Sequence, residues 1–426
     1  MRGFAPDSPW KLDPGIVFLN HGSFGACPEP VIEARRAILE ELEANPMTAL
    51  ERAFEPRLDA ARAEVARFIG ADPQGTVVVP NATTGVSTVL RSLRFRPGDE
   101  LLTTDHEYNA CLNALHAAAG EAHARVVSVR IPLPIRDPRE VTEALLAAVT
   151  PRTRLALVSH VTSPSGLVFP IEDIVRELDR LGVDTLVDAA HSPGMVPVDV
   201  GALGAAYWTA NCHKWLCAPK VSGVLVVRGD RRHLVRPLVT SHGENDPRTD
   251  RPRLWQLFDW PGTSDPSPFL TVPFAIRLLA TLHPDGWPGL MAENRDAAIR
   301  SRRVLLAALG GEAIAPESML GSMASVVLPG GLLASDEDAT ALRDALASDD
   351  GIEVPISPFP VPAARARRGS PPSMYFVRVS RQRYVEDADV ERLVEAFARR
   401  GIGAGAPGRA VGAAAETAGG SAIVGA

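Results

Sequence analysis

Short runs of β-branched and aliphatic residues alternate with longer amphipathic stretches along the first two-thirds of this 426-residue chain. Residues 76–80 (TVVVP) read as a buried strand, and Val86, Val89, Leu90 and Leu93 then follow the spacing of one helix face. This alternation predicts an α/β domain with a mostly parallel sheet. Further strands are expected at residues 100–104, 125–131, 155–159, 185–189, 205–210 and 222–227, and helices at residues 140–149 and 171–181.

A second, smaller α+β unit is expected after the polar stretch of residues 236–268. Its predicted elements are helices from residue 270 and at 290–309, 339–347 and 387–400, with strands at 325–328 and 374–380. Residues 401–426 are nearly all small and are expected to be a disordered tail.

Composition excludes several classes of function. Hydrophobic residues make up 46% and charged residues 22%, which is ordinary for a soluble globular protein. A net charge of -7 gives no electrostatic case for binding nucleic acid or an anionic membrane. No apolar stretch has the length of a membrane span, and four scattered cysteines do not form a disulfide framework. A cytoplasmic protein is expected.

Lysine is scarce in this chain. Lysine and arginine together number 44, but only Lys11, Lys214 and Lys220 are lysines. Unlike arginine, a lysine can lose its proton and attack a carbonyl group. Lys214 lies in the segment NCHKW after an apolar run, which makes it a candidate covalent catalyst. On composition alone, a genome rich in arginine codons is the preferred explanation, and the sequence around Lys214 reverses that preference.

Asp188 and Lys214 follow two successive predicted strands. Ligand sites of α/β sheets lie at the carboxyl ends of strands, so both side chains are expected in one crevice. A carboxylate and an amine there suit a cofactor aldehyde, with the carboxylate holding a pyridinium nitrogen. Taken by itself, Asp188 is better explained as a cap of the loop that follows it. A zinc site at Cys212, His213 and Cys217 is disfavoured because no second ligand pair is apparent.

Residues 81–85 (NATTG) join the first strand of this domain to a helix. Free amides at a helix N-terminus attract anions, which predicts a phosphate site, although a plain helix cap would have the same sequence. The segment matches neither a Walker loop nor a dinucleotide fingerprint.

These motifs together resemble the class V aminotransferase-like branch of fold-type I pyridoxal phosphate (PLP) enzymes, and within it the isopenicillin N epimerase family. The resemblance covers roughly residues 15–400. The segments that carry it are residues 18–25, 81–85, 104–109, 159–166, 188–191, 211–215, 262–263 and 378–380.

The resemblance implies PLP as cofactor and assigns the residues around its ring. Lys214 would form the Schiff base and later move the Cα proton, and Asp188 would pair with the pyridine nitrogen. Tyr108 would stack on the ring. His191 and Ser163 would approach the phenolic oxygen, although many relatives have Asn where this chain has Ser163.

Phosphate contacts are implied for Thr83, Thr84 and His213. A homodimer with shared active sites is also implied, in which Thr263 reaches the phosphate of the partner subunit.

For an amino-acid substrate, the resemblance implies that Arg378 clamps the carboxylate. Asn20 and His21 would line the entrance. The same family shows a Tyr-Asn pair soon after this arginine, whereas here Tyr384 is followed by Val385.

The implied fold is a large domain with a mostly parallel seven-stranded sheet and a smaller C-terminal α+β domain. The predicted bounds are an N-terminal arm at 1–30 that lines the active site, a PLP-binding domain at 31–270, a small domain at 271–400 and the tail.

The implied chemistry is formation of an external aldimine with an amino acid, followed by removal of the Cα proton. An epimerase-like reaction is the first choice, with a C–S lyase and a class V aminotransferase as alternatives, and a PLP-fold protein without turnover as a different class. A persulfide-forming desulfurase is disfavoured because residues 354–372 contain no cysteine.

Overall fold

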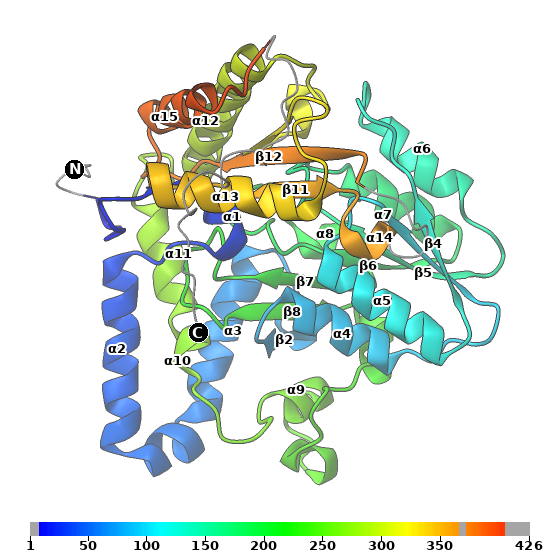
Figure 1. Cartoon of the computed structure of the whole chain (residues 1–426). Helices are drawn as coiled ribbons and strands as arrows, with labels where there is room; N and C mark the ends of the chain where they lie inside the picture. Colours follow the sequence, from blue (N-terminus) through cyan, green and yellow to red (C-terminus); the bar gives the residue numbers. More distant parts are fainter. Residues whose placement is uncertain (1–7, 366–371, 405–426) are drawn as a thin grey trace, which may run out of the picture.

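The computed structural model describes residues 8–365 and 372–404, and a seven-stranded sheet forms the centre of its large domain (Figure 1). The strand order is β2-β8-β7-β6-β5-β3-β4. Strand β8 is antiparallel to both β2 and β7, and the remaining neighbours are parallel. The strands are β2 (Thr76–Val79), β3 (Glu100–Thr104), β4 (Arg125–Val129), β5 (Thr153–Ser159), β6 (Asp184–Asp188), β7 (Tyr207–Asn211) and β8 (Gly223–Val227).

Helices cover both faces of this sheet, as its buried strands require. On one face, α4 (Ala82–Ser92), α5 (Asn109–Glu121) and α9 (Arg253–Phe258) pack into one apolar core. On the other face, a larger core includes α3 (Phe54–Phe68), α6 (Arg139–Ala147) and α7 (Ile171–Arg180). This domain also contains the short helix α8 (Val200–Leu203) and a π-helical turn, Thr48–Arg52.

Close contact between α4 and the sheet depends on a glycine. A Cβ atom at Gly85 would lie 2.0 Å from the Oγ1 atom of Thr209 on β7. The helix therefore rests directly on the strand, and its N-terminus is held beside the carboxyl end of β7.

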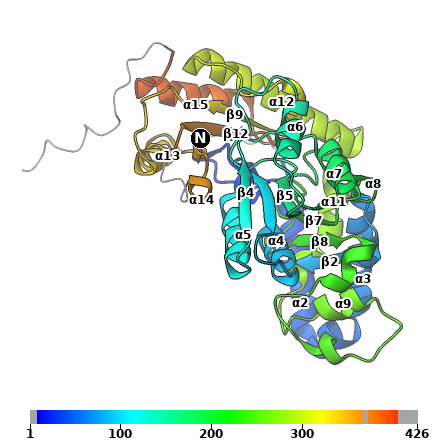
Figure 2. The same cartoon turned by 90° about the vertical axis from the view of Figure 1, so that its right-hand side faces the viewer.

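The smaller domain lies above the large sheet in Figure 1, and Figure 2 shows it from the side. Its antiparallel sheet has the order β11-β12-β9 and packs in the larger core with three helices. The elements are α12 (Gly286–Leu309), β9 (Met323–Val327), α13 (Asp336–Asp350), β11 (Ile356–Phe359), α14 (Pro362–Arg365), β12 (Met374–Ser380) and α15 (Asp387–Arg399).

The N-terminal segment joins the two domains. Strand β1 (Val17–Phe18) pairs in parallel with β10 (Ile352–Glu353) of the small domain. The short helix α1 (His21–Phe24) then reaches the loop after β7, where a Cβ atom at Gly25 would lie 2.2 Å from the carbonyl oxygen of His213. Gly25 has a φ of 69°, so a side chain there is excluded by both space and backbone conformation.

The predicted fold class is confirmed, including the seven-stranded sheet. Sequence periodicity did not resolve the N-terminal helices α2 (Glu29–Ala44) and α3, and the helix expected from residue 270 is two elements, α10 (Ser267–Leu270) and α11 (Val272–Ala280). The predicted domain bounds stay predictions. The predicted disordered tail begins at residue 401, but Ile402 is buried in the structure. Residues 405–426 of that tail lie outside the described part of the chain. No helix in the described part of the chain is long and apolar enough to cross a membrane.

Candidate active site

One edge of the large sheet collects the chemically active side chains. Strands β3, β5, β6 and β7 run in parallel, and β2 has the same direction because both β2 and β7 are antiparallel to β8. Their carboxyl ends therefore meet at one edge, as in other open α/β sheets. A cavity of about 310 Å³ opens there. The predicted residues that line it are Thr83, Tyr108, Ser163, Asp188, His191, His213 and Lys214.

Lys214 lies in the loop after β7, and its amine faces this cavity. Its Nζ atom is 3.2 Å from the Nε2 atom of His191, which follows β6. Removal from water lowers the pKa of Lys214 to about 8, and the positive charge of Arg378 adds to the shift. A substantial fraction of the amine is thus neutral near pH 8, as nucleophilic attack requires.

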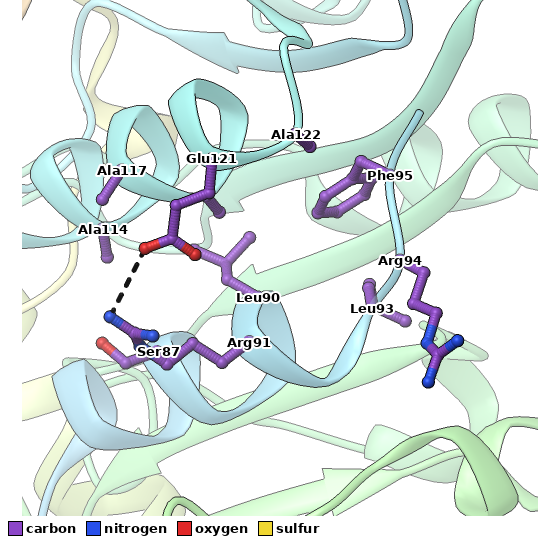
Figure 3. Close-up of a pocket in the computed structure, with 11 residues that line it drawn as sticks. Ser87, Leu90, Arg91, Leu93, Arg94, Phe95, Ala114, Ala117, Glu121 and Ala122 are labelled. Atoms are coloured by element: carbon purple, nitrogen blue, oxygen red, sulfur yellow. Dashed lines mark ion pairs between the residues drawn. The ribbon is translucent and has the colours of Figure 1, made fainter. Parts of the chain in front are cut away.

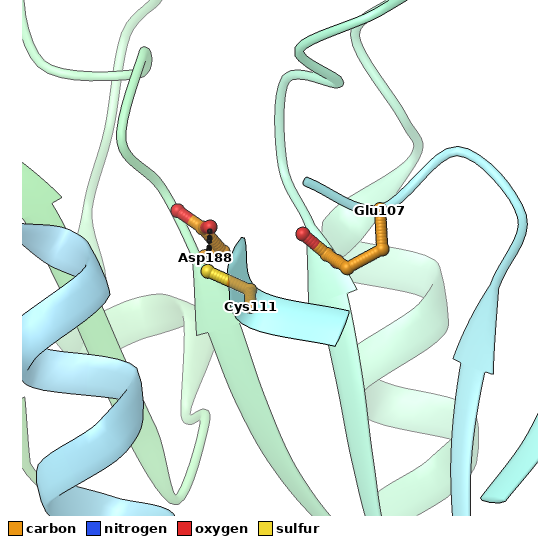
Figure 4. Close-up of side chains that lie close together, drawn as sticks. All are labelled: Glu107, Cys111 and Asp188. Carbon is orange, nitrogen blue, oxygen red and sulfur yellow. Dashed lines mark hydrogen bonds between the residues drawn. The ribbon is translucent and has the colours of Figure 1, made fainter. Parts of the chain in front are cut away.

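Asp188 ends β6 and is 3% exposed. The backbone N–H of Ala190 donates to its Oδ1 atom at 2.9 Å, and the Cys111 thiol donates to Oδ2 at 3.2 Å. Burial raises the pKa of Asp188, whereas these two donors and the charge of Lys214 act in the opposite direction. Figure 4 shows that Asp188 and Cys111 lie beside a second buried carboxyl group, that of Glu107.

The N-terminus of α4 lies at the same cavity. Asn81 caps this helix by accepting from the backbone N–H of Thr84 at 2.9 Å, and the Thr84 hydroxyl donates to the same oxygen at 3.1 Å. Thr83 faces the cavity, and neither its amide nor its hydroxyl has a partner among the described residues. Of the two predicted threonines, Thr83 therefore has donors available for an anion, whereas Thr84 completes the helix cap.

His213 adds a polar group at this end of the site. Its Nδ1–H donates to the carbonyl of Ser222 at 3.0 Å, which leaves Nε2 for another partner. Burial lowers the pKa of His213 to about 4. His213 lines the same cavity as Thr83, as the predicted phosphate site requires.

Arg378 on β12 brings a buried cation from the small domain. Its side chain is 4% exposed, and its guanidinium donates to the Ser163 carbonyl, to Ser23 Oγ at 3.2 Å and to Asn20 Oδ1 at 3.5 Å. All three acceptors are neutral, and no acidic residue in the described part of the chain pairs with Arg378. Desolvation lowers its pKa to about 10. An unpaired buried guanidinium is costly, and an anionic ligand would relieve that cost.

His21 and Thr263 do not line the Lys214 cavity, and neither does Asn20, which contacts Arg378 instead. His21 is fully buried and does not line the cavity: its ring bonds the Tyr384 hydroxyl at 2.7 Å and the Lys214 carbonyl at 3.0 Å. Burial lowers the pKa of His21 to about 3. Thr263 lines a separate cavity of about 620 Å³, together with Met47 and Trp260.

A further hollow lies between α4 and α5 and shares no residue with the Lys214 cavity (Figure 3). Arg91 and Glu121 face each other across it at 3.8 Å, and both are more than 60% exposed. A solvated ion pair of this kind contributes little to stability. The hollow therefore presents solvated charges, whereas the Lys214 cavity presents buried reactive groups.

A family model described as "Aminotransferase class-V" matches residues 17–249, more than half of the chain. The chain belongs to the class V aminotransferase family. The predicted resemblance to this family of PLP enzymes is confirmed, and so is the assignment as an enzyme of this family.

Curated relatives within the class V family have two kinds of name. An isopenicillin N epimerase from Amycolatopsis lactamdurans is 34% identical over 402 residues, which cover 91% of this chain and 96% of the relative. A putative L-cysteine desulfhydrase 1 from Oryza sativa subsp. japonica is 33% identical over 406 residues, which cover 90% and 82%. Sequence similarity of this degree does not separate the two reactions.

Among solved structures, a cysteine desulfurase from Escherichia coli superposes with a TM-score of 0.73 at 21% sequence identity, over 92% of this chain and 96% of that one. This similarity establishes the class V fold.

The sequence did not reveal the contacts of several further residues at this class V site. Ser23 lines the cavity and contacts Arg378, and Asn211 fixes the start of α4 by accepting from the Ala82 N–H at 2.8 Å. Glu107 and Trp215 are fully buried beside Asp188 and His191. Both residues lie inside motifs on which the family resemblance rests, so the sequence could have pointed to their positions. Their contacts could not be read from the sequence, because they join segments that are distant in the chain.

Proposed function

We propose that this chain is a PLP-dependent enzyme that removes the Cα proton of an amino acid and acts as an epimerase. The observation that carries the proposal is the pairing of two groups. Lys214 supplies an amine with a lowered pKa, and Arg378 supplies a buried guanidinium that lacks an acidic partner among the described residues. A small substrate with a carboxylate beside its reacting carbon fits both.

PLP fits the donor set of the Lys214 cavity. Lys214 would hold its aldehyde carbon covalently, and Asp188 would hold the ring nitrogen. Thr83 and His213 would bind the phosphate. When bound, the cofactor withdraws electrons from the Cα–H bond and makes its proton removable.

Lys214 is proposed as the base that accepts this proton once its amine is free. His191 lies 3.2 Å from Nζ and is neutral, because burial, followed by the charge of Lys214, lowers its pKa far below the ordinary range. A neutral neighbour does not add to the charge around Lys214, so the amine stays basic enough to accept a proton.

Epimerisation also needs a group that returns a proton from the opposite face. Tyr108 is the proposed donor. It lines the cavity, comes from the β3–α5 connection rather than from the Lys214 loop, and interacts electrostatically with Arg378. Desolvation raises the pKa of Tyr108, so its phenol carries a proton at neutral pH.

Incubation with L-amino acids in heavy water tests the proposal. Product with deuterium at Cα and inverted configuration is expected. Tyr108→Phe, which keeps the aromatic ring, should retain Cα exchange but lose inversion. Tyr108→Phe with wild-type inversion would refute the role of Tyr108, and keto acid as the only product would identify an aminotransferase instead.

Loading of the cofactor is tested separately. Apoprotein mixed with PLP and reduced with borohydride should carry one modified residue, Lys214, by peptide mass spectrometry. Lys214→Ala should carry none, and Lys11→Arg, a change at an exposed lysine, should react as the wild type does. A reducible adduct in Lys214→Ala would refute the assignment.

A C–S lyase is the second candidate, supported by the desulfhydrase named above at nearly the same identity as the epimerase. Elimination needs one base and one carboxylate anchor, and therefore does not require the Tyr108 hydroxyl. Release of pyruvate and sulfide from L-cysteine at an equal rate in wild type and Tyr108→Phe would select this reaction.

A homodimer is part of the proposal. The rim of the Lys214 cavity exposes Phe24 and Val221, at 68% and 61%, so both apolar side chains are available to a partner subunit beside the site. Thr263 would then serve the partner's site. Light scattering should give twice the mass of the chain, and a monomer that binds PLP fully would contradict the shared site.

A further inference from the structure

Three buried groups beside the cavity are not used by the mechanism above as a set: Glu107, Cys111 and Asp188 (Figure 4). Glu107 precedes α5, Cys111 lies in the first turn of α5, and Asp188 ends β6. One ligand atom from each lies within 4.8 Å of the other two, and no side chain is more than 3% exposed. Two carboxyl groups thus share one dry space.

Hydrogen bonding distinguishes the two carboxyl groups. Each oxygen of Asp188 accepts from a donor, Ala190 N–H or the Cys111 thiol. In Glu107, Oε1 accepts from the Ser159 hydroxyl at 2.6 Å and from the Tyr108 N–H at 2.8 Å. Its Oε2 atom is buried and has no partner among the described residues. Donors therefore stabilise a charge on Asp188, and the bare Oε2 atom is the position for a proton.

Electrostatics agree with this assignment. Two carboxylates in a desolvated site do not both ionise readily. Burial raises the pKa of Glu107 to about 8, and the charge of Asp188 is the next cause. For Asp188, the two hydrogen-bond donors and the charge of Lys214 act to lower the pKa. The Cys111 thiol stays protonated, since burial raises its pKa well above the ordinary value.

We infer that Glu107 is a positioning residue for the cofactor site: held as a neutral acid, it leaves Asp188 as the single negative charge that faces the ring nitrogen. This inference rests on the proposed use of PLP. One charge on the pair balances one protonated ring nitrogen. If Glu107 ionised, the pair would carry two negative charges in the same space, and the ring environment would change.

Charged and titratable groups from each neighbouring element enter this balance. Tyr108 and Cys111 come from the β3–α5 region, Asp188 from β6 and Lys214 from the loop after β7. From β5, the uncharged Ser159 contributes hydrogen bonds from its hydroxyl and its backbone. Of these, Lys214 is covalently engaged in the loaded enzyme. The nitrogen of that covalent link can also titrate, so the transition that belongs to Glu107 is the one that a substitution at Glu107 removes.

The test is a pH titration of the absorbance of bound PLP in the wild-type holoenzyme and in Glu107→Gln. The glutamine copies the protonated acid and cannot ionise. Wild type should show a spectral transition near pH 8 that Glu107→Gln loses, while the variant binds PLP at neutral pH. Asp188→Asn is the comparison: it should weaken PLP binding at every pH.

Identical titrations of wild type and Glu107→Gln would overturn the inference, and so would loss of PLP binding equal to that of Asp188→Asn. Infrared spectroscopy of the wild-type holoenzyme needs no variant: the band of a protonated buried carboxyl should be present at pH 7 and disappear through pH 8. Its absence at pH 7 would also overturn the inference. Failure of wild type to form a Lys214 adduct would instead refute the proposed function.

Discussion

The indole Nε1–H of Trp215 points at the Nδ1 atom of His191 across 3.4 Å. An indole nitrogen can only donate, so Nδ1 must be the acceptor and the proton of the neutral ring lies on Nε2. This Nε2–H faces the Nζ atom of Lys214. Only a neutral amine can accept from it, so Trp215 favours the deprotonated form of Lys214 through the tautomer of His191.

Trp215→Phe should therefore raise the pKa of the Lys214 amine. Without the indole donor, the His191 proton can move to Nδ1, and Nε2 can then accept from a protonated lysine. One such hydrogen bond contributes about 0.5–1.5 kcal/mol, or up to about one pKa unit. The measurement is the rate of PLP adduct formation by the apoprotein as a function of pH.

Trp208→Phe is the matched control, because Trp208 is equally buried and its Nε1 atom has no partner among the described residues. An unchanged pH profile in Trp215→Phe, or the same shift in both variants, would contradict the tautomer argument.

Adduct formation by the wild-type apoprotein should rise with pH and level off above about pH 8. The sign follows from the lowered pKa of Lys214: below pH 8 the amine is mostly protonated and cannot attack, and the neutral fraction falls about tenfold per pH unit. A rate that continues to rise to about pH 10, the range of an ordinary lysine, would show that the amine is not desolvated.

Arg378→Ala should raise KM much more than it lowers kcat. A charge-assisted hydrogen bond contributes about 1.5–3 kcal/mol, so KM for an amino acid should rise about 10- to 150-fold. Arg378→Lys should recover only part of this, because an ammonium group lacks the planar fork that matches a carboxylate. Steady-state kinetics and PLP affinity are the measurements.

For Arg378, the control is Arg383→Ala, which removes a partly exposed arginine that pairs with Glu293. Loss of PLP binding in Arg378→Ala, with KM unchanged for the remaining holoenzyme, would show that Arg378 does not bind the substrate carboxylate.

Stability should depend on a buried ion-pair network away from the catalytic groups. Arg62 on α3 is fully buried, pairs with Asp259 at 2.5 Å and Asp59 at 2.9 Å, and lies 3.9 Å above the ring of Trp255. Arg62→Ala leaves Asp259 buried with less compensation, so the free energy of unfolding should fall by about 3–5 kcal/mol.

Denaturant unfolding of the apoprotein measures this effect. Arg57→Ala on the same helix removes a more exposed pair with Glu41 and should change the free energy of unfolding by less than about 1 kcal/mol. If both substitutions lowered the free energy of unfolding by the same amount, burial would not explain the contribution of the Arg62 pairs.

Sequence patterns were sufficient to predict the strands of the large sheet and the candidate residues Asp188 and Lys214, but not the helices α2 and α3. Alternating apolar runs predicted the strands of the large sheet, because burial on both faces imposes continuous apolar sequence. A carboxylate and a lysine after successive strands located Asp188 and Lys214, since the carboxyl ends of parallel strands share an edge. Apolar runs, residues at strand ends and family motifs are all short segments of sequence, so each can be recognised without knowledge of the fold.

Which residues contact one another became apparent from the three-dimensional arrangement. The Trp215–His191 contact, the unpartnered charge of Arg378 and the two carboxyl groups of Glu107 and Asp188 each join segments that are distant in the chain. The ionisation of these groups depends on burial and on neighbours from other elements, which no spacing along one strand encodes. For the same reason, Thr83 and Thr84 look equivalent in the sequence, although one faces the cavity and the other completes a helix cap.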